Sequence, residues 1–120
     1  MRKLFVVLIL LVATNAFADF SGEYVKKNGV VDVTQKDKMI QFSINSSVEQ
    51  HACNLEGTAV LIDKNRAAYT SNDNTDKCVA VLTFSKNGLK VTTKDCDSYC
   101  GLNAAGSMDG AYKKKASKKK

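Results

Sequence analysis

Apolar and polar residues alternate along most of this chain. Val31 and Val33 begin the pattern, and Ile40, Phe42 and Ile44 continue it. The same alternation returns later, with apolar positions at Leu55, Ala59, Leu61, Ala80, Leu82, Phe84, Leu89 and Val91. A period of two, with many valines and threonines, is typical of antiparallel strands that are buried on one face. After the first eighteen residues, the sequence contains no stretch with the spacing of a helix.

Polar turn signals separate these stretches about every ten residues, which is the spacing of a small β-sandwich or barrel. The clearest is Asn87-Gly88, which predicts a two-residue type I′ turn that pairs Lys86 with Leu89. The pattern predicts eight strands, near 22–27, 29–35, 38–46, 52–62, 66–71, 78–85, 89–95 and 107–113. We therefore expect an all-β domain, either an eight-stranded antiparallel meander barrel or a closely packed sandwich, stapled by disulfides.

The alternation also predicts which side chains form the core. They are Val31, Val33, Ile40, Phe42, Ile44, Leu55, Leu61, Leu82, Phe84, Leu89 and Val91. An internal echo favours closure into a barrel. Phe20-Ser21-Gly22-Glu23-Tyr24 opens the domain, Met108-Asp109-Gly110-Ala111-Tyr112 ends it, and both place Gly two residues before Tyr. The first and last strands of an up-and-down barrel must pair, and closure protects the edges of a sheet that has no proline.

Residues 1–18 have the pattern of a secretory signal peptide. Arg2 and Lys3 precede an apolar run from Leu4 to Val12, and Ala16-Phe17-Ala18 forms a cleavage site. The run is too short to span a bilayer, and no second apolar stretch of about 20 residues follows. We expect a mature chain that begins at Asp19, with a single β domain over 19–112. The protein should be exported and soluble, in the periplasm or secreted.

Four cysteines remain after removal of the signal: Cys53, Cys78, Cys96 and Cys100. An even number in a short exported chain predicts two disulfides. The predicted hairpin places Val79 opposite Cys96, so that Cys78 lies nearby. We prefer the pairing Cys78–Cys100 with Cys53–Cys96, and Cys78–Cys96 with Cys53–Cys100 is the close alternative. An oxidising compartment favours these bridges over zinc at Cys96 and Cys100, so no metal is expected.

The net charge of +6 belongs mainly to the end of the chain. Residues 19–112 carry ten basic and twelve acidic residues, a net charge of −2. We expect residues 113–120 to be disordered beyond the first lysine or two, and dispensable for folding. Their lysines are candidate contacts with anionic lipid or wall polymer: Lys113, Lys114, Lys115, Lys118, Lys119 and Lys120. The body of the chain has no face that combines basic and aromatic residues, so specific binding of nucleic acid is not expected.

The residues that catalysis requires are sparse. His51 is the only histidine, and nothing in the sequence fixes Ser46 or Ser47 beside it. Asp95 and Asp97 flank Cys96, and a carboxylate pair for glycoside hydrolysis would require two nearby acids. The simpler interpretation is that they keep a loop beside a disulfide soluble. Residues 72–76 are rich in oxygen ligands but lack the Gly and the distal Glu of a calcium loop. We therefore expect a protein that is not an enzyme, with no catalytic residues and no cofactor.

Three segments carry a resemblance to a known group. They are Phe20-Ser21-Gly22-Glu23-Tyr24, Leu82-Thr83-Phe84, and the stretch from Cys100-Gly101 to Asp109-Gly110-Ala111-Tyr112-Lys113. With the signal and the four cysteines, the chain resembles an uncharacterised group of small exported β-proteins of Gram-negative bacteria. In size and architecture it is also similar to periplasmic lysozyme inhibitors and to immunity proteins against wall-degrading effectors.

This resemblance implies a non-enzymatic binding protein whose partner is another protein, foremost a lysozyme-like cell-wall hydrolase. The acidic balance of the body would complement a basic hydrolase. Two alternatives remain open. One is a carrier that holds a small apolar ligand inside the barrel. The other is a surface-associated structural protein held by its lysine tail.

Overall fold

The chain folds into a closed antiparallel barrel of eight strands. We analysed a computed structural model, which describes residues 18–71, 77–101 and 104–116. The strands are β1 Gly22–Lys26, β2 Gly29–Lys36, β3 Met39–Val48, β4 His51–Leu61, β5 Arg66–Thr70, β6 Val79–Ser85, β7 Gly88–Lys94 and β8 Gly110–Lys114, with a short 3₁₀ helix, η1, at Asp97–Tyr99. Each strand pairs with its neighbours in chain order, and β8 pairs with β1. The predicted all-β class and eight antiparallel strands are confirmed, and the sheet is a barrel rather than a sandwich.

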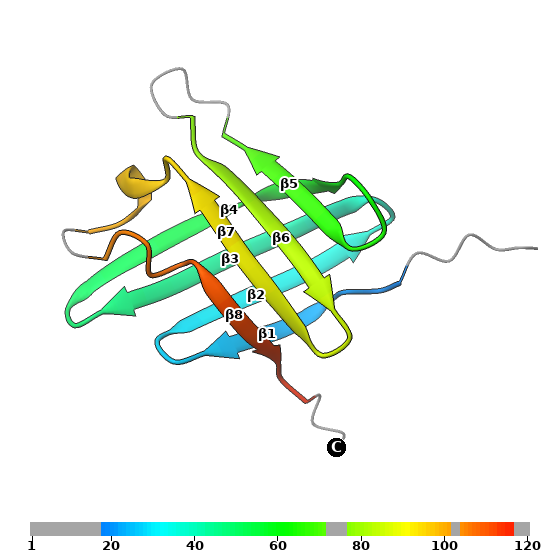
Figure 1. Cartoon of the computed structure of the whole chain (residues 1–120), viewed down its shortest axis with the longest axis horizontal. Helices are drawn as coiled ribbons and strands as arrows, with labels where there is room; N and C mark the ends of the chain where they lie inside the picture. The colour runs from blue at the N-terminus through cyan, green and yellow to red at the C-terminus, as the bar shows by residue number, and fades with distance from the viewer. Residues whose placement is uncertain (1–17, 72–76, 102–103, 117–120) are drawn as a thin grey trace, which may run out of the picture.

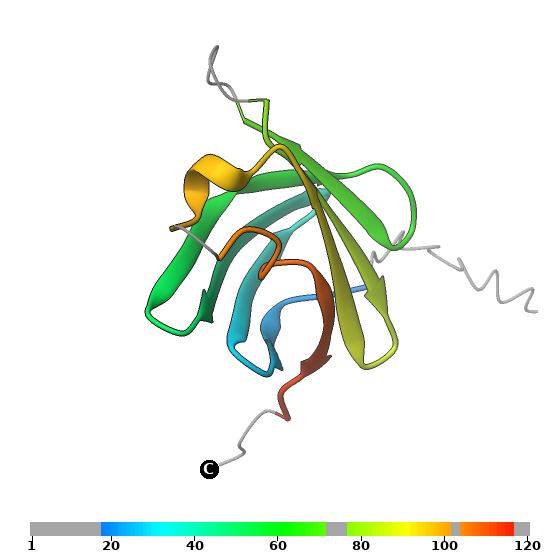
Figure 2. The same cartoon turned by 60° about the vertical axis from the view of Figure 1, so that its left-hand side comes forward.

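The barrel has two halves that cross. Figure 1 shows β5 to β8 passing in front of β1 to β4, and Figure 2 shows the same sheet from the side. The bounds of the first seven strands match the prediction to within one or two residues. The last strand differs, because Ser107 and Met108 lie in a turn and β8 begins only at Gly110. The predicted signal peptide lies outside the described residues, apart from Ala18.

The interior is filled by the alternating apolar side chains. Ten of the eleven predicted core residues are buried, and Leu61 is half-buried and packs against the core at the end of β4. The sequence analysis did not include several further members of the same buried cluster, namely Tyr24, Ala59, Ala67, Ala80, Ala104, Met108, Tyr112 and the cysteines Cys53, Cys78 and Cys96. Side chains from all eight strands therefore meet in one continuous core.

The turn between β6 and β7 differs from its prediction. Ser85 pairs with Gly88 and Phe84 with Leu89, so Lys86 and Asn87 form the loop. Neither Asn87 nor Gly88 has a positive φ, so the predicted type I′ turn at these two residues is wrong. Gly88 has a different role, because a Cβ atom there would lie 2.8 Å from the backbone oxygen of Tyr112. The glycine allows β8 to approach β7 closely.

The two segments of the sequence echo meet at the seam between β1 and β8. Tyr24 pairs with Lys114 and Val25 with Lys113 across this seam. Each echo tyrosine donates a hydrogen bond from its hydroxyl to a carbonyl four residues earlier. Tyr24 donates to Phe20 and Tyr112 donates to Met108, both at 2.7 Å. The repeated sequence therefore forms the same local structure twice.

A lysine from each side of the seam crosses to the tyrosine of the other side. The Nζ atom of Lys26 lies 5.0 Å from the ring centroid of Tyr112, and that of Lys114 lies 5.8 Å from the ring centroid of Tyr24. Both distances are in the range of cation–π attraction. Lys26 also donates a hydrogen bond to the Asp109 carbonyl. We call these four residues, Tyr24, Lys26, Tyr112 and Lys114, the seam clasp.

We predict that Gly88→Ala destabilises the barrel by opening β7 from β8. The added methyl would press on the Tyr112 carbonyl, and overpacking of this kind costs about 1–3 kcal/mol. The matched control is Asn87→Ala, because the Asn87 side chain is exposed and its carbonyl still accepts the Lys114 N–H. Chemical denaturation should show a lower free energy of unfolding for the first variant alone. Equal values for the two variants would contradict the role given to Gly88.

A second prediction concerns the Tyr112 hydroxyl. Burial, followed by the nearby Asp109 carboxylate, raises the pKa of Tyr112 to about 12. An unfolded tyrosine ionises near pH 10. The neutral phenol therefore stabilises the fold below pH 10, and this stabilisation is lost as the pH rises from about 10 to 12. Absorbance titration should show one tyrosine ionising near pH 12, and Tyr112→Phe should remove that step and flatten the alkaline loss of stability.

Candidate functional site

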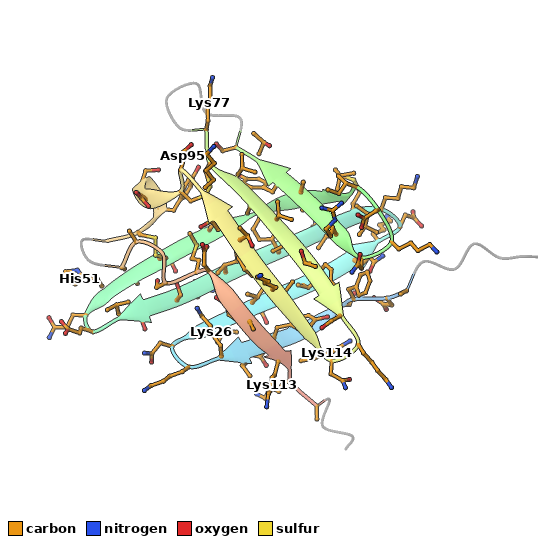
Figure 3. The ribbon with its side chains drawn as sticks, in the orientation of Figure 1. Lys26, His51, Lys77, Asp95, Lys113 and Lys114 are labelled. Carbon is orange, nitrogen blue, oxygen red and sulfur yellow. A yellow bond between two sulfur atoms is a disulfide. The ribbon has the colours of Figure 1, made fainter. Side chains whose placement is uncertain are left out.

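The two ends of the barrel carry different groups. In an up-and-down barrel, alternate connections lie at the same end. The connections β1–β2, β3–β4, β5–β6 and β7–β8 share one end, which holds both disulfides. We name five of its side chains, Glu49, His51, Asp95, Asp97 and Tyr99, the stapled rim, and Lys27, Lys77 and Lys94 are exposed at the same end. The opposite end is the lysine end, with Lys36, Lys38, Lys64, Lys86, Lys114 and Lys115. Figure 3 shows Lys77 and Asp95 far from Lys113 and Lys114.

The stapled rim is built by the short segment that follows β7. Asp95 adopts a positive φ of 59°, which turns the chain out of the strand. The 3₁₀ turn η1 then returns it, with Cys100 N–H donating to the Asp97 carbonyl at 3.0 Å. Gly101 N–H donates to the Ala52 carbonyl at 2.8 Å, which attaches the segment to the edge of β4. A disulfide at each end fixes the segment, so the side chains of 97–99 are held on a rigid support.

The disulfides are Cys53–Cys100 and Cys78–Cys96. The preferred prediction, Cys78–Cys100 with Cys53–Cys96, is therefore wrong, and the close alternative is confirmed. The reason is the hairpin register. Val79 pairs with Lys94 rather than with Cys96, so Cys96 follows the end of β7 and meets Cys78. The η1 turn then carries Cys100 to β4, where it forms an isolated bridge with Cys53. Two disulfides indicate that the protein folds in an oxidising environment.

The rim side chains are accessible in different degrees. Asp95 and Asp97 are exposed, and Tyr99 is half-buried against the core. His51 is half-buried beside Gly101, where a Cβ atom would lie 3.5 Å from the His51 Nδ1 atom. Ser46 is buried, and its hydroxyl hydrogen-bonds the Ser107 hydroxyl at 2.7 Å. The structure therefore places the Ser46 hydroxyl with Ser107 and not with His51.

The candidate lysines of the chain end divide into two groups. Lys113 and Lys114 belong to β8, and Lys115 forms an ion pair with Glu23 at 3.3 Å. The Lys115 N–H also donates to the Glu23 carbonyl at 2.7 Å. The fold thus continues past the boundary predicted at residue 113, because pairing with β1 satisfies this backbone. Lys118, Lys119 and Lys120 lie outside the described residues, as does the polar segment 72–76.

Two hollows open at the lysine end beside the seam. One, of about 710 Å³, is lined by Ser21, Gly22, Glu23, Asn87, Lys114, Lys115 and Ala116. The other, of about 410 Å³, brings together Lys64 and Lys86 from two separate turns and Lys114 from the end of β8. The aromatic side chains of Phe20, Tyr24 and Phe84 lie along this second hollow. Lys114 lines both, so the two hollows adjoin.

The sequence analysis missed this gathering of lysines. It assigned the excess positive charge to the tail, because the charges of the body nearly cancel when they are summed along the chain. In a meander barrel, every second turn returns to the same end. Lys36 and Lys38, then Lys64, then Lys86 occupy three such turns. The lysine end could have been found by assigning each charged residue to its turn and grouping alternate turns, instead of summing the charges along the chain.

Comparisons with protein-family models, with curated proteins and with solved structures find no match to this chain. Within residues 18–71, 77–101 and 104–116, no helix is long and apolar enough to cross a membrane. The same residues contain no group of three or more His, Cys, Asp and Glu side chains placed to hold a metal ion. The candidate sites therefore rest on the surface chemistry of the two barrel ends.

We predict that non-reducing peptide mapping finds the pairs Cys53–Cys100 and Cys78–Cys96. The two bridges should also differ in strength, because the first closes a separation of 47 residues and the second one of 18. Loop-closure entropy then makes the first worth about 0.9 kcal/mol more than the second. Denaturation of the two double Cys→Ala variants measures this difference. A disulfide-linked peptide that joins Cys78 to Cys100 would contradict the assignment. A larger loss of unfolding free energy on removal of the Cys78–Cys96 bridge than of the Cys53–Cys100 bridge would contradict the expected order.

Proposed function

We propose that this protein is an exported, non-enzymatic binding protein that inhibits a lysozyme-like cell-wall hydrolase in the periplasm. The stapled rim carries this proposal. It presents the exposed carboxylates Asp95 and Asp97 on a segment that two disulfides fix to β4 and to the residue before β6. A recognition surface that is rigid before binding loses less entropy when the complex forms.

The carboxylates of the rim would face a basic partner, beside the exposed Lys27 and Lys77 of the same end. Glu49 adds a third exposed carboxylate at the β3–β4 turn. Acidic groups at the rim of an interface speed association with a basic protein more than they tighten the final complex. Tyr99 in the same η1 turn is half-buried, and tyrosine is the kind of side chain that anchors protein interfaces. The rim therefore offers both steering and an aromatic contact.

The barrel interior supports binding at the outer surface rather than inside. An eight-stranded barrel either is filled by its own side chains or holds one small ligand. Here Phe42, Phe84 and Leu82 are at most 3% exposed, and they belong to one continuous apolar cluster. Tyr24 and Tyr112 close the same core at the seam. A ligand inside the barrel would have to displace these side chains, so a protein partner is the function that we favour over an apolar carrier.

The test is inhibition of wall lysis by purified hydrolases of the lysozyme class. Mature protein should form a saturable complex of fixed stoichiometry and slow the lysis of cell-wall suspensions. Asp95→Asn/Asp97→Asn should lower the association rate constant by about tenfold at low salt, and added salt should narrow the difference. The matched control is Asp32→Asn/Glu56→Gln, which removes two exposed carboxylates from the barrel wall.

Two outcomes would overturn this proposal. One is the absence of any saturable complex with the hydrolases tested. The other is an equal loss of association rate in the Asp95/Asp97 variant and in the Asp32/Glu56 control, which would show that the effect comes from net charge alone. A lipid or chromophore that copurifies with the protein in fixed proportion would instead support the carrier.

A further inference from the structure

The lysine end has a strong excess of exposed cations. Lys36 and Lys38 flank the β2–β3 turn, Lys64 and Lys86 lie in the next two turns at this end, and Lys114 and Lys115 complete β8. The acidic groups of the same end are Asp19, Glu23, Asp37 and Asp63. Two of these are already engaged, because Asp63 binds Arg66 at 2.6 Å and Glu23 binds Lys115 at 3.3 Å. Hydrogen bonds from Asn65 and Arg66 also hold the pKa of Asp63 below its usual value.

Exposed apolar side chains stand at the same end. Of the described residues, four large apolar side chains are exposed, and three of them lie here: Ile62 at 56%, Met39 at 46% and Val60 at 44%. Met39 and Val60 are direct partners across β3 and β4. Ile62 follows Val60 by two residues, which places it on the same outer face. The turn that contains Ile62 also carries Lys64, so cations and apolar groups are adjacent.

The hollow of about 410 Å³ adds a concave cationic site between these turns. Lys64, Lys86 and Lys114 line it, together with the carboxylate of Asp19. Its aromatic floor is firm, since the Phe20 ring stacks on the Phe84 ring with centroids 4.3 Å apart. The Tyr24 hydroxyl donates a hydrogen bond to the Phe20 carbonyl at 2.7 Å, which fixes the backbone beside the hollow. An anionic head group would meet three ammonium groups here above an apolar base.

We infer that the lysine end docks on the surface of an anionic phospholipid bilayer. Protruding apolar side chains reach the boundary between head groups and acyl chains, while flanking lysines bind lipid phosphates. This combination distinguishes a bilayer from a soluble polyanion, which would use the lysines but have no place for Ile62 and Met39. End-on docking would leave the stapled rim facing away from the membrane. The inference is independent of the hydrolase proposal, because it uses the opposite end of the barrel.

Vesicle cosedimentation of the full-length mature protein tests the inference. The vesicles contain phosphatidylcholine alone or mixed with an equal part of phosphatidylglycerol. We expect binding only to the mixed vesicles, and a decrease with added salt. Lys64→Gln/Lys86→Gln should weaken it by about 25-fold, which corresponds to about fivefold, or about 1 kcal/mol, for each lysine. The matched control is Lys27→Gln/Lys77→Gln, which removes two exposed lysines from the other end and should change binding by less than about twofold.

Ile62→Ser separates a bilayer from other polyanions. This variant keeps every charge, and its loss of bilayer affinity should persist at high salt, because the buried apolar area does not depend on screening. Binding to dextran sulfate, a soluble polyanion, should be unaffected by the same change. The inference is overturned by equal losses in the two lysine pairs, by no selectivity for anionic vesicles, or by an Ile62→Ser variant that binds vesicles as the parent does. Hydrolase inhibition should be unchanged in Lys64→Gln/Lys86→Gln and in Ile62→Ser, which lie at the opposite end from the stapled rim, so the two proposals can fail separately.

Discussion

The seam between β1 and β8 is the constraint on which the rest of the molecule depends. A sheet of eight strands becomes a barrel only if its first and last strands pair, and an open sheet would expose two unprotected edges. The direct pairing across this seam is short, with Tyr24 opposite Lys114 and Val25 opposite Lys113. The Lys26–Tyr112 contact extends it on one side, and the hydrogen bond from the Lys115 N–H to the Glu23 carbonyl extends it on the other. Because the seam closes the barrel, it fixes where the connecting turns lie, and these turns carry the charged side chains of both ends.

The antiparallel meander sorts the charged residues of the turns between the two ends of the barrel. Turns alternate between the two ends, so residues that are mixed along the chain are separated in space. The stapled end carries the rim carboxylates together with Lys27, Lys77 and Lys94, whereas the opposite end carries an excess of lysines with exposed apolar neighbours. The excess positive charge of the described residues is therefore concentrated at the lysine end.

The sequence predicted the strands and most of the core because burial of one face imposes a period of two. It did not predict the β6–β7 register, since a shift of two residues keeps Leu82 and Phe84 on the same face and leaves the pattern unchanged. That shift moved Cys96 beyond the end of the hairpin, where it meets Cys78, and the η1 turn carries Cys100 to Cys53. The stapled rim was hidden because it depends on the disulfide pairing and the η1 turn, whereas the lysine end could have been found by sorting the charged residues by turn.

The neighbouring ends of the first and last strands have a consequence for redesign. The Lys115 N–H donates to the Glu23 carbonyl at 2.7 Å, so the start of β1 and the end of β8 lie side by side. A short linker can join them, and new termini can be opened at another exposed turn, which is the condition for circular permutation. Opening the chain at the Lys86-Asn87 loop would convert the present seam from a meeting of termini into an ordinary hairpin. The echoed Gly-x-Tyr-x-Lys segments would then lie on consecutive strands, as two copies of one motif in a continuous ribbon.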